Sequence, residues 1–163
     1  MSRSKGTLHM LCGKIAAGKS TLSDELGKAE NTVVISEDRW IAQLYPSEIK
    51  GLGDYFERSE RLRVTLAPHI VDLLRVGVSV VLDFHANTVR ARKWMRGLFE
   101  QAEAPHQLHF LDVPNEVCLA RMHARRAAGE HALSDTEFHH VTSSFVAPSP
   151  DEGLNVIRHG DKS

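Results

Sequence analysis

One glycine-rich stretch near the start of the chain constrains the fold more than any other feature. Residues 13–20 read Gly-Lys-Ile-Ala-Ala-Gly-Lys-Ser, the pattern G-x-x-x-x-G-K-S of a phosphate-binding loop. Residues 7–12 before it are short and mostly apolar, as in a buried strand, and residues 21–26 suit the start of a helix. Because strand, loop and helix in this order form the context that the pattern requires, it predicts a phosphate site rather than an ordinary turn.

The residue types of this loop suit phosphate for physical reasons. Glycine lets the backbone turn sharply and approach a ligand, and the loop N–H groups converge at the positive end of a helix dipole. We expect Lys19 to contact the β- and γ-phosphates of ATP and the Ser20 hydroxyl to bind Mg²⁺. The predicted nucleotide contacts within the loop are Gly13, Lys14, Ala16, Ala17, Gly18, Lys19, Ser20 and Thr21.

Composition limits the class of protein. The chain has 163 residues, 42% of them hydrophobic, enough for one compact core, and no linker marks a second domain, so we expect a single domain over residues 1–163. It contains no apolar run long enough to span a membrane, and its opening residues lack the apolar core of a signal peptide. Two distant cysteines, Cys12 and Cys118, suit a reduced compartment, so we expect a cytoplasmic protein.

Charge and histidine spacing argue against two further classes. The net charge of −1 lacks the basic excess typical of a dedicated nucleic-acid binder. The ten histidines form no H-E-x-x-H pattern and no Cys/His cluster, so their spacing does not indicate a structural metal site.

Hydrophobic patterns alternate between strand and helix along the chain, which predicts a parallel α/β sheet. After the loop strand, we expect strands at 32–36, 78–83, 107–112 and 154–158, and helices at 19–28, 37–44, 54–76, 88–103, 115–128 and 134–145. Pro68 is expected to kink the long helix, Gly77 to end it, and Ser134 with Glu137 to cap the last one.

Ligands of parallel sheets bind beyond the carboxyl ends of the strands, so the polar residues there are the candidates for chemistry. They are residues 36–39 after the second strand, Asp83, His85 and Asn87 at the third, and Asp112 at the fourth. Asp38 follows the second strand, and we predict that it is the base that accepts the proton of an acceptor hydroxyl. A helix-start carboxylate is the alternative, which Glu37 would fill equally well. Asp83 ends the third strand, as a ligand of Mg²⁺ water would, or merely marks the strand end.

Two arginines are candidates to neutralise the negative charge that develops on the phosphates during phosphoryl transfer. Arg121 and Arg125 lie one turn apart on one face of a predicted helix, where they could clamp the phosphates of ATP. With the glycine and polar residues that follow, residues 115–133 would form a mobile lid. The alternative is a solvated basic face.

The sequence resembles the small P-loop kinases of the group that contains phage polynucleotide kinase, chloramphenicol phosphotransferase and the zeta toxins. The resemblance covers nearly the whole chain and rests on GKIAAGKST at 13–21, ISEDRW at 35–40, VVLDFHAN at 80–87 and CLARMHARR at 118–126. It implies a P-loop NTPase fold, a three-layer α/β/α sandwich with a five-stranded parallel sheet of order 2-3-1-4-5 and a helical lid. It also implies that Asp38 activates the acceptor and that Arg121 and Arg125 are lid arginines, so that Lys19, Asp38 and these arginines form the catalytic set.

Two departures weaken a nucleic-acid acceptor. Polynucleotide kinases carry a phosphate-holding arginine three residues after the base, where this chain has Ile41, and their D-x-N turn is two residues longer here, as Asp83-Phe-His-Ala-Asn87. We expect the acceptor pocket between residues 38–45 and the helix around 55–63. Its aromatic lining, or equally part of the core, would be Trp40, Tyr45, Tyr55 and Phe56.

The sequence therefore favours an ATP-dependent kinase, monomeric or homodimeric, that phosphorylates a hydroxyl of a small molecule such as an antibiotic or a sugar nucleotide. A polynucleotide 5′-kinase and a regulatory ATP-binding module with slow ATPase activity are the alternatives. Asp38 separates the classes, because a regulatory module has little use for a carboxylate that activates a hydroxyl.

Overall fold

Five parallel strands form the centre of the fold in a computed structural model, which describes residues 4–160. Their spatial order is β2-β3-β1-β4-β5, which confirms the order predicted from the resemblance. In chain order they are β1 (Leu8–Gly13), β2 (Thr32–Ser36), β3 (Ser79–His85), β4 (His106–Leu111) and β5 (Val156–His159).

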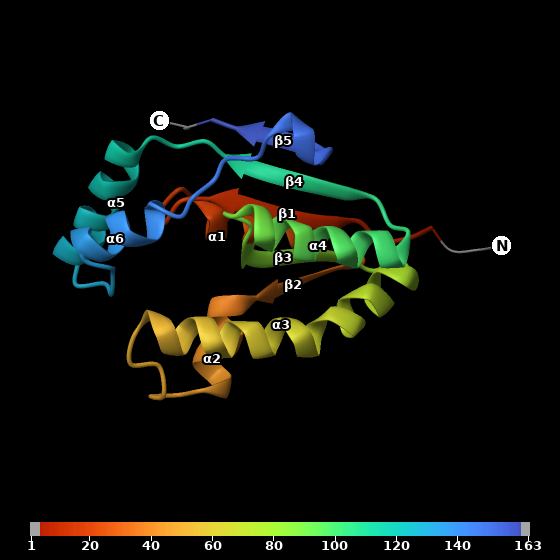
Figure 1. The fold of residues 1–163 in the computed structure, drawn as a ribbon, viewed down its shortest axis with the longest axis horizontal. Coiled ribbons are helices and arrows are strands. Elements are labelled where there is room, and N and C mark those ends of the chain that lie inside the picture. The colour runs from red at the N-terminus through yellow and green to blue at the C-terminus, as the bar shows by residue number, and fades with distance from the viewer. Residues whose placement is uncertain (1–3, 161–163) are drawn as a thin grey trace.

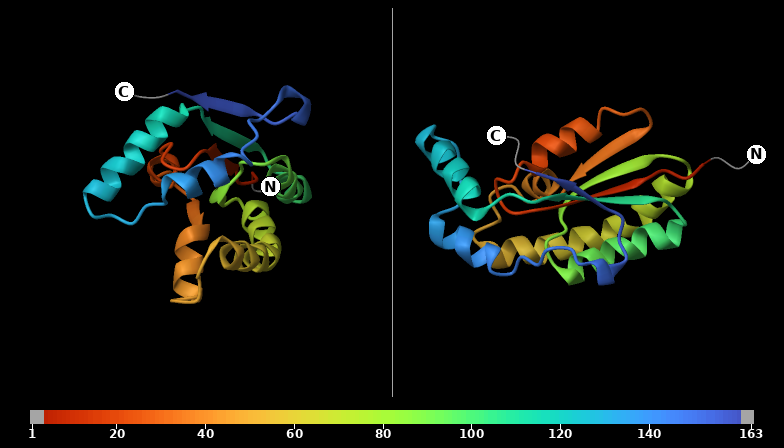
Figure 2. Two further views of the ribbon diagram at one scale, coloured as in Figure 1. Left: turned by 60° about the vertical axis from the view of Figure 1, so that its left-hand side comes forward. Right: turned by 90° about the horizontal axis from the view of Figure 1, so that it is seen from above.

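Helices cover both faces of the sheet and the end at which the strands finish. Those of the described chain are α1 (Lys19–Leu26), α2 (Glu37–Leu44), α3 (Leu52–Arg75), α4 (Val89–Ala102), α5 (Asn115–Ala127), α6 (Asp135–Thr142) and the short 3₁₀ helix η1 (Pro150–Glu152). Figure 2 shows α1 on one side of the sheet and α3 with α4 on the other. In Figure 1, α5 and α6 lie beyond the arrowheads of the strands. The predicted three-layer α/β/α fold is therefore confirmed.

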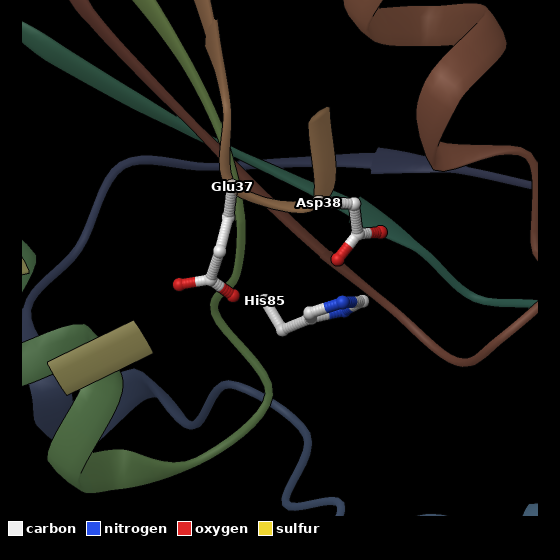
Figure 3. Close-up of side chains that lie close together, drawn as sticks. All are labelled: Glu37, Asp38 and His85. Atoms are coloured by element: carbon white, nitrogen blue, oxygen red, sulfur yellow. The ribbon is translucent and has the colours of Figure 1, made fainter. Parts of the chain in front are cut away.

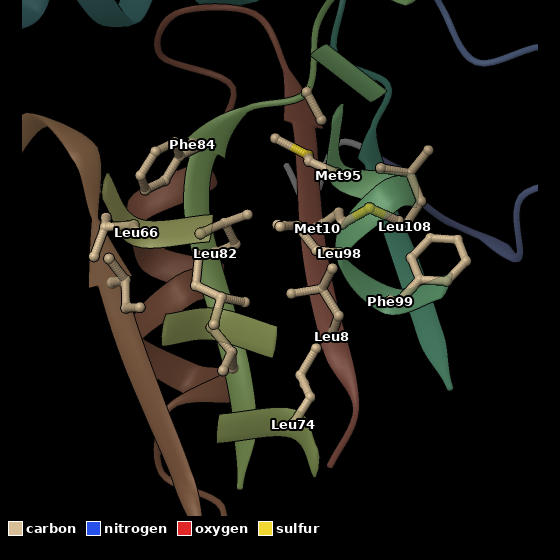
Figure 4. Packing of buried hydrophobic residues seen from close by; sticks show 14 of the residues in the cluster. Leu8, Met10, Leu66, Leu74, Leu82, Phe84, Met95, Leu98, Phe99 and Leu108 are labelled. Atoms are coloured by element: carbon tan, nitrogen blue, oxygen red, sulfur yellow. The ribbon is translucent and has the colours of Figure 1, made fainter. Parts of the chain in front are cut away.

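The larger core lies between the sheet and the pair α3–α4 (Figure 4). It forms because α3 has apolar residues at three- and four-residue spacing, which puts them on one face. The buried residues of that face are Leu62, Leu66, Ile70 and Leu74. They face α4 and the strands, whose inward residues include Leu8, Met10, Leu82, Met95, Leu98 and Leu108. Pro68 lies inside α3, which remains one continuous helix through it.

The pairing of β1 with β3 contains an irregularity at the carboxyl end of the sheet. Met10 lies opposite Leu82, but the next residue, Leu11, lies opposite His85, so β3 carries two extra residues at this point. One of them, Phe84, is fully buried in the core. The bulge thus accommodates the longer segment 83–87, and it places His85 at the tip of β3.

A buried arginine fastens the carboxyl-terminal part of the chain to the sheet. Arg92 on α4 is 1% exposed and donates to the carbonyl oxygens of Ala86 and Val146 and to the carboxylate of Glu152. Because these partners come from the residue after β3, the loop after α6 and η1, Arg92 holds these three segments together. No helix in residues 4–160 is long and apolar enough to cross a bilayer.

Candidate active site

The glycine-rich loop joins β1 to α1 with backbone conformations that explain its composition. Gly18 has φ +103°, which L side chains rarely adopt, and Ala16 also has a positive φ of +65°. A Cβ on Gly13 would lie 3.2 Å from the Cβ of Leu111 and 3.3 Å from that of Ala17, so neighbouring side chains leave little room there. No described side chain caps α1, and its first N–H groups are therefore available to an anion.

A close ion pair lies at the end of the phosphate loop. Lys19 Nζ contacts Asp83 Oδ1, and each side chain is 10% exposed. The residue predicted to bind phosphate and the residue predicted to hold the metal therefore lie side by side. Ser20 and Thr21, at the start of α1, are exposed.

Asn87 links the segment that follows β3 to the phosphate loop. Its side-chain oxygen accepts from the backbone N–H of Gly13 at 2.9 Å, and its amide nitrogen donates to the Gly13 carbonyl oxygen at 2.8 Å. The two bonds hold the start of the phosphate loop against the segment that follows β3. The sequence placed Asn87 among the polar residues at the end of the third strand, but no local pattern indicates its pairing with Gly13.

Glu37 and Asp38, at the start of α2, occupy contrasting environments. Glu37 is 1% exposed. Its carboxylate accepts from Tyr55 at 3.1 Å, Ser59 at 2.6 Å and Arg63 Nε at 3.2 Å, all on α3. Asp38 is exposed. The hydrogen bonds of Glu37 thus link α2 to α3, whereas the carboxylate of Asp38 is accessible to solvent.

Arg63 is held in place by more than its ion pair with Glu37. Its guanidinium lies over the rings of Phe84, at 5.5 Å, and Trp94, at 5.2 Å from the centroids. Such cation–π contacts strengthen when they are shielded from water. In the sequence, Arg63 only ends the range 55–63 that was expected to line the acceptor pocket. Its role could not be predicted, because its partners come from β3, α2 and α4.

Tyr55 joins the two carboxylates. Its hydroxyl contacts Asp38 Oδ1 as well as Glu37 Oε1. Burial raises the pKa of Tyr55, and the negative charges of Glu37 and Asp38 raise it further. The phenol therefore stays protonated and donates its hydrogen to the carboxylates.

His85 lies between these groups (Figure 3). The charges of Lys19 and Asp83, next to the phosphate loop, and of Glu37 and Asp38, at the start of α2, all act on its ring. Burial lowers the pKa of His85, and the positive charge of Lys19 lowers it further, while the three carboxylates oppose the shift. The sequence placed His85 among the polar residues at the end of the third strand, and within VVLDFHAN, but indicated no role for it.

The four aromatic residues expected near the acceptor divide between surface and core. Tyr55 contacts Asp38, as described, and Tyr45 is partly buried beneath the guanidinium of Arg58 at 4.8 Å. Trp40 and Phe56 are exposed, by 36% and 59%. Tyr55 is thus the one of the four that touches the candidate base.

The two predicted lid arginines differ in position. Arg121 Nη1 donates to the carbonyl oxygen of Ala16 at 3.1 Å, so it already touches the phosphate loop. Arg125 is exposed. The same helix, α5, is tied to the start of α6 because His123 and Arg126 both contact Asp135. The hydrogen bond from Arg126 lowers the pKa of Asp135 most, and the bond from His123 lowers it further.

Comparison with known proteins shows that most of the chain matches one family model. The family model AAA_33, described as an AAA domain, matches residues 8–148. No curated protein matches the chain.

Several solved structures share the fold. A provisionally assigned kinase from Chloroflexus aurantiacus has a TM-score of 0.77 at 18% identity, covering 96% of this chain and 86% of that one. The Mycobacterium tuberculosis APS kinase CysC, solved with AMPPNP and APS, has a TM-score of 0.65 at 20% identity, covering 98% and 91%. A sugar kinase from Janibacter sp. has a TM-score of 0.63 at 21% identity, covering 96% and 85%. At these identities the likeness establishes the fold alone.

Proposed function

Because this chain belongs to the AAA_33 family of AAA domains and has a P-loop kinase fold, we propose that it transfers the γ-phosphate of ATP to a hydroxyl of a small molecule. The observation that carries the proposal is that Glu37 and Asp38 lie close to His85, at the tip of the same strand whose Asp83 pairs with Lys19 of the phosphate loop. It brings an accessible carboxylate next to the loop that would hold the phosphates.

The proposed reaction uses these groups for positioning and charge. The loop N–H groups and Lys19 would hold the β- and γ-phosphates, and Arg121 and Arg125 would neutralise the charge that develops during transfer. Asp38 would accept the proton of the acceptor hydroxyl as its oxygen bonds to the γ-phosphorus and ADP leaves. Tyr55, which donates to Asp38, would orient this carboxylate.

The residues present also fit Mg²⁺. Ser20 offers an exposed hydroxyl at the start of α1, and Asp83 offers a carboxylate beside Lys19. Both are oxygen ligands, which Mg²⁺ prefers, and the ion would contribute charge neutralisation between the phosphates. We propose that residues 1–163 act as one kinase domain, with residues 115–133 as its lid.

A polynucleotide 5′-kinase is less well supported. At the place where such enzymes carry a phosphate-holding arginine, Ile41 is 2% exposed and packs into the main core. An apolar, buried side chain cannot bind the phosphate of a nucleic acid there.

Substitution of Asp38 tests the proposal. Screening hydroxylated metabolites and antibiotics with labelled ATP would first identify an acceptor. Asp38→Asn, which removes the proton acceptor with little change of shape, should then bind ATP as the wild type does but transfer phosphate about 10²–10⁴-fold more slowly. Asp83→Asn should instead raise the Mg²⁺ concentration needed for activity.

Asp24→Asn, which alters an exposed carboxylate on α1, serves as the matched control and should leave the rate unchanged. Transfer by Asp38→Asn at the wild-type rate would reduce Asp38 to a helix-start carboxylate. If the wild type phosphorylated no acceptor but hydrolysed ATP slowly, the regulatory-module alternative would gain.

A further inference from the structure

Three side chains with metal-binding chemistry converge beside the phosphate site. Glu37, Asp38 and His85 each offer one ligand atom, and these atoms all lie within 4.8 Å of one another (Figure 3). In that view the two carboxylates come from the start of α2 and point toward the imidazole at the tip of β3. The set therefore combines two oxygen donors with one nitrogen donor.

The imidazole is available to a ligand. No hydrogen bond from a described residue engages the ring nitrogens of His85, although the ring is partly buried. The irregular pairing of Leu11 with His85 explains how the ring arrives there, because the two extra residues of β3 carry it past the regular strand end. A histidine left without a hydrogen bond and directed at two carboxylates is an arrangement that a cation would complete.

The local charges also leave room for a cation. Lys19 is paired with Asp83, and Arg63 is paired with Glu37. Within residues 4–160, no lysine, arginine or histidine forms an ion pair with Asp38, whose one polar side-chain partner is the neutral hydroxyl of Tyr55. The group of three carboxylates and two cations thus carries one negative charge in excess.

Coordinating capacity is distributed unevenly over the set. A carboxylate can accept about four hydrogen bonds or metal contacts. Glu37 already accepts from three side chains, so it retains about one position, whereas Asp38 accepts from Tyr55 and retains about three. Asp38 and His85 would therefore be the principal ligands and Glu37 the third.

We propose that Glu37, Asp38 and His85 bind a divalent transition-metal ion of the class of Zn²⁺ or Co²⁺, independently of nucleotide. An imidazole ligand favours such ions over Mg²⁺, which prefers oxygen. This site is distinct from the Mg²⁺ site proposed at Ser20 and Asp83. Since the bound ion would occupy the lone pairs of Asp38, it would also inhibit phosphate transfer, a consequence that rests on the proposed function.

Metal binding to the nucleotide-free, full-length protein tests the site without reference to catalysis. Calorimetric titration with Zn²⁺ and the visible absorption of bound Co²⁺ should reveal one site with a nitrogen ligand, and excess Mg²⁺ should displace little of it. His85→Asn and Asp38→Asn should each weaken binding by at least about tenfold. Thermal melting of each variant establishes that it is folded.

A control variant excludes another place for the ion. His109→Asn alters a row of close imidazoles elsewhere on the described chain, in which the ring nitrogens of His109 lie 3.1 Å from His9 and 3.0 Å from His159. This variant should bind Zn²⁺ as the wild type does.

Three outcomes would overturn the proposal. The first is an absence of binding at micromolar Zn²⁺, and the second is binding that His85→Asn and Asp38→Asn leave unchanged, which would mean adventitious surface binding only. The third is loss of binding in His109→Asn. If His85→Asn did not fold, Asp38→Asn would decide, because Asp38 is exposed and its amide should be tolerated.

Discussion

Lys19 is the residue whose removal should most directly weaken nucleotide binding. Loss of a charge-assisted phosphate contact costs about 1.5–3 kcal/mol, so Lys19→Ala should bind Mg·ATP about ten- to a hundredfold more weakly. Calorimetric titration of ATP measures the difference. Lys28→Ala is the matched control, because Lys28 forms an exposed pair with Glu25 at 2.8 Å. Equal affinities of Lys19→Ala and wild type would contradict the assigned phosphate contact.

The contribution of Arg63 to the free energy of unfolding depends on its buried partner, Glu37. Arg63→Leu would leave the buried carboxylate of Glu37 without its cation, and breaking such a pair costs about 3 kcal/mol or more. We expect chemical denaturation to show that loss of stability. In the control Arg61→Leu, which breaks an exposed pair with Glu57 at 3.1 Å, the change should stay below about 1 kcal/mol. Similar losses in both variants would refute the role given to Arg63.

At the scale of elements, α5 is the segment that we expect to respond to nucleotide. Arg121 contacts the loop at Ala16, whereas Arg125 is exposed and would reach ATP only if the helix closed further. Hydrogen exchange over residues 115–133 should therefore slow when Mg·ATP binds. Residues 89–102, which form α4 on the far face, provide the internal control. Identical exchange with and without nucleotide would favour the solvated basic face.

At the scale of the whole molecule, a row of histidines makes stability depend on pH. His109 on β4 contacts His9 on β1 at 3.1 Å and His159 on β5 at 3.0 Å, so the row spans three strands. Burial, and then the neighbouring His9 and His159, lowers the pKa of His109 to about 4. The pKa of His9 is lowered as well, by burial. The folded state therefore favours neutral imidazoles.

The sign of the effect follows from proton linkage. Between about pH 6.5, where histidine titrates in an unfolded chain, and about pH 4, the unfolded state binds more protons than the folded state. The contribution of these neutral histidines to the free energy of unfolding is thus fully present above this window, and it is lost as the pH falls through it. Thermal melting at pH 7 and pH 5 should show a smaller loss for His109→Asn than for the wild type. The control His69→Asn, which alters an exposed histidine on α3, should behave as the wild type. An unchanged loss in His109→Asn would contradict the argument.

Local signals in the sequence were sufficient to predict the succession of strands and helices along the chain. The phosphate-loop pattern at 13–20, the apolar stretches and the periodic leucines of α3 each depend on a few neighbouring residues, so the alternation of strands and helices could be read directly. The strand order required the resemblance to a family, since periodicity alone does not say which strands pair. The capping box of Ser134 and Glu137, again a local pattern, is present at the start of α6.

The surroundings of the site were decided by the tertiary structure. Glu37 and Asp38 are adjacent and chemically similar, yet packing against α3 buries Glu37 and leaves Asp38 exposed. His85 joins them only because the pairing of β1 with β3 shifts by two residues, and Asn87 reaches Gly13 across 74 positions of the chain. The sequence by itself determined which segments become strands, helices and a phosphate loop, because those choices depend on near neighbours. Which side chains meet at the ends of the strands depends on register and burial, which arise only when distant segments pack together.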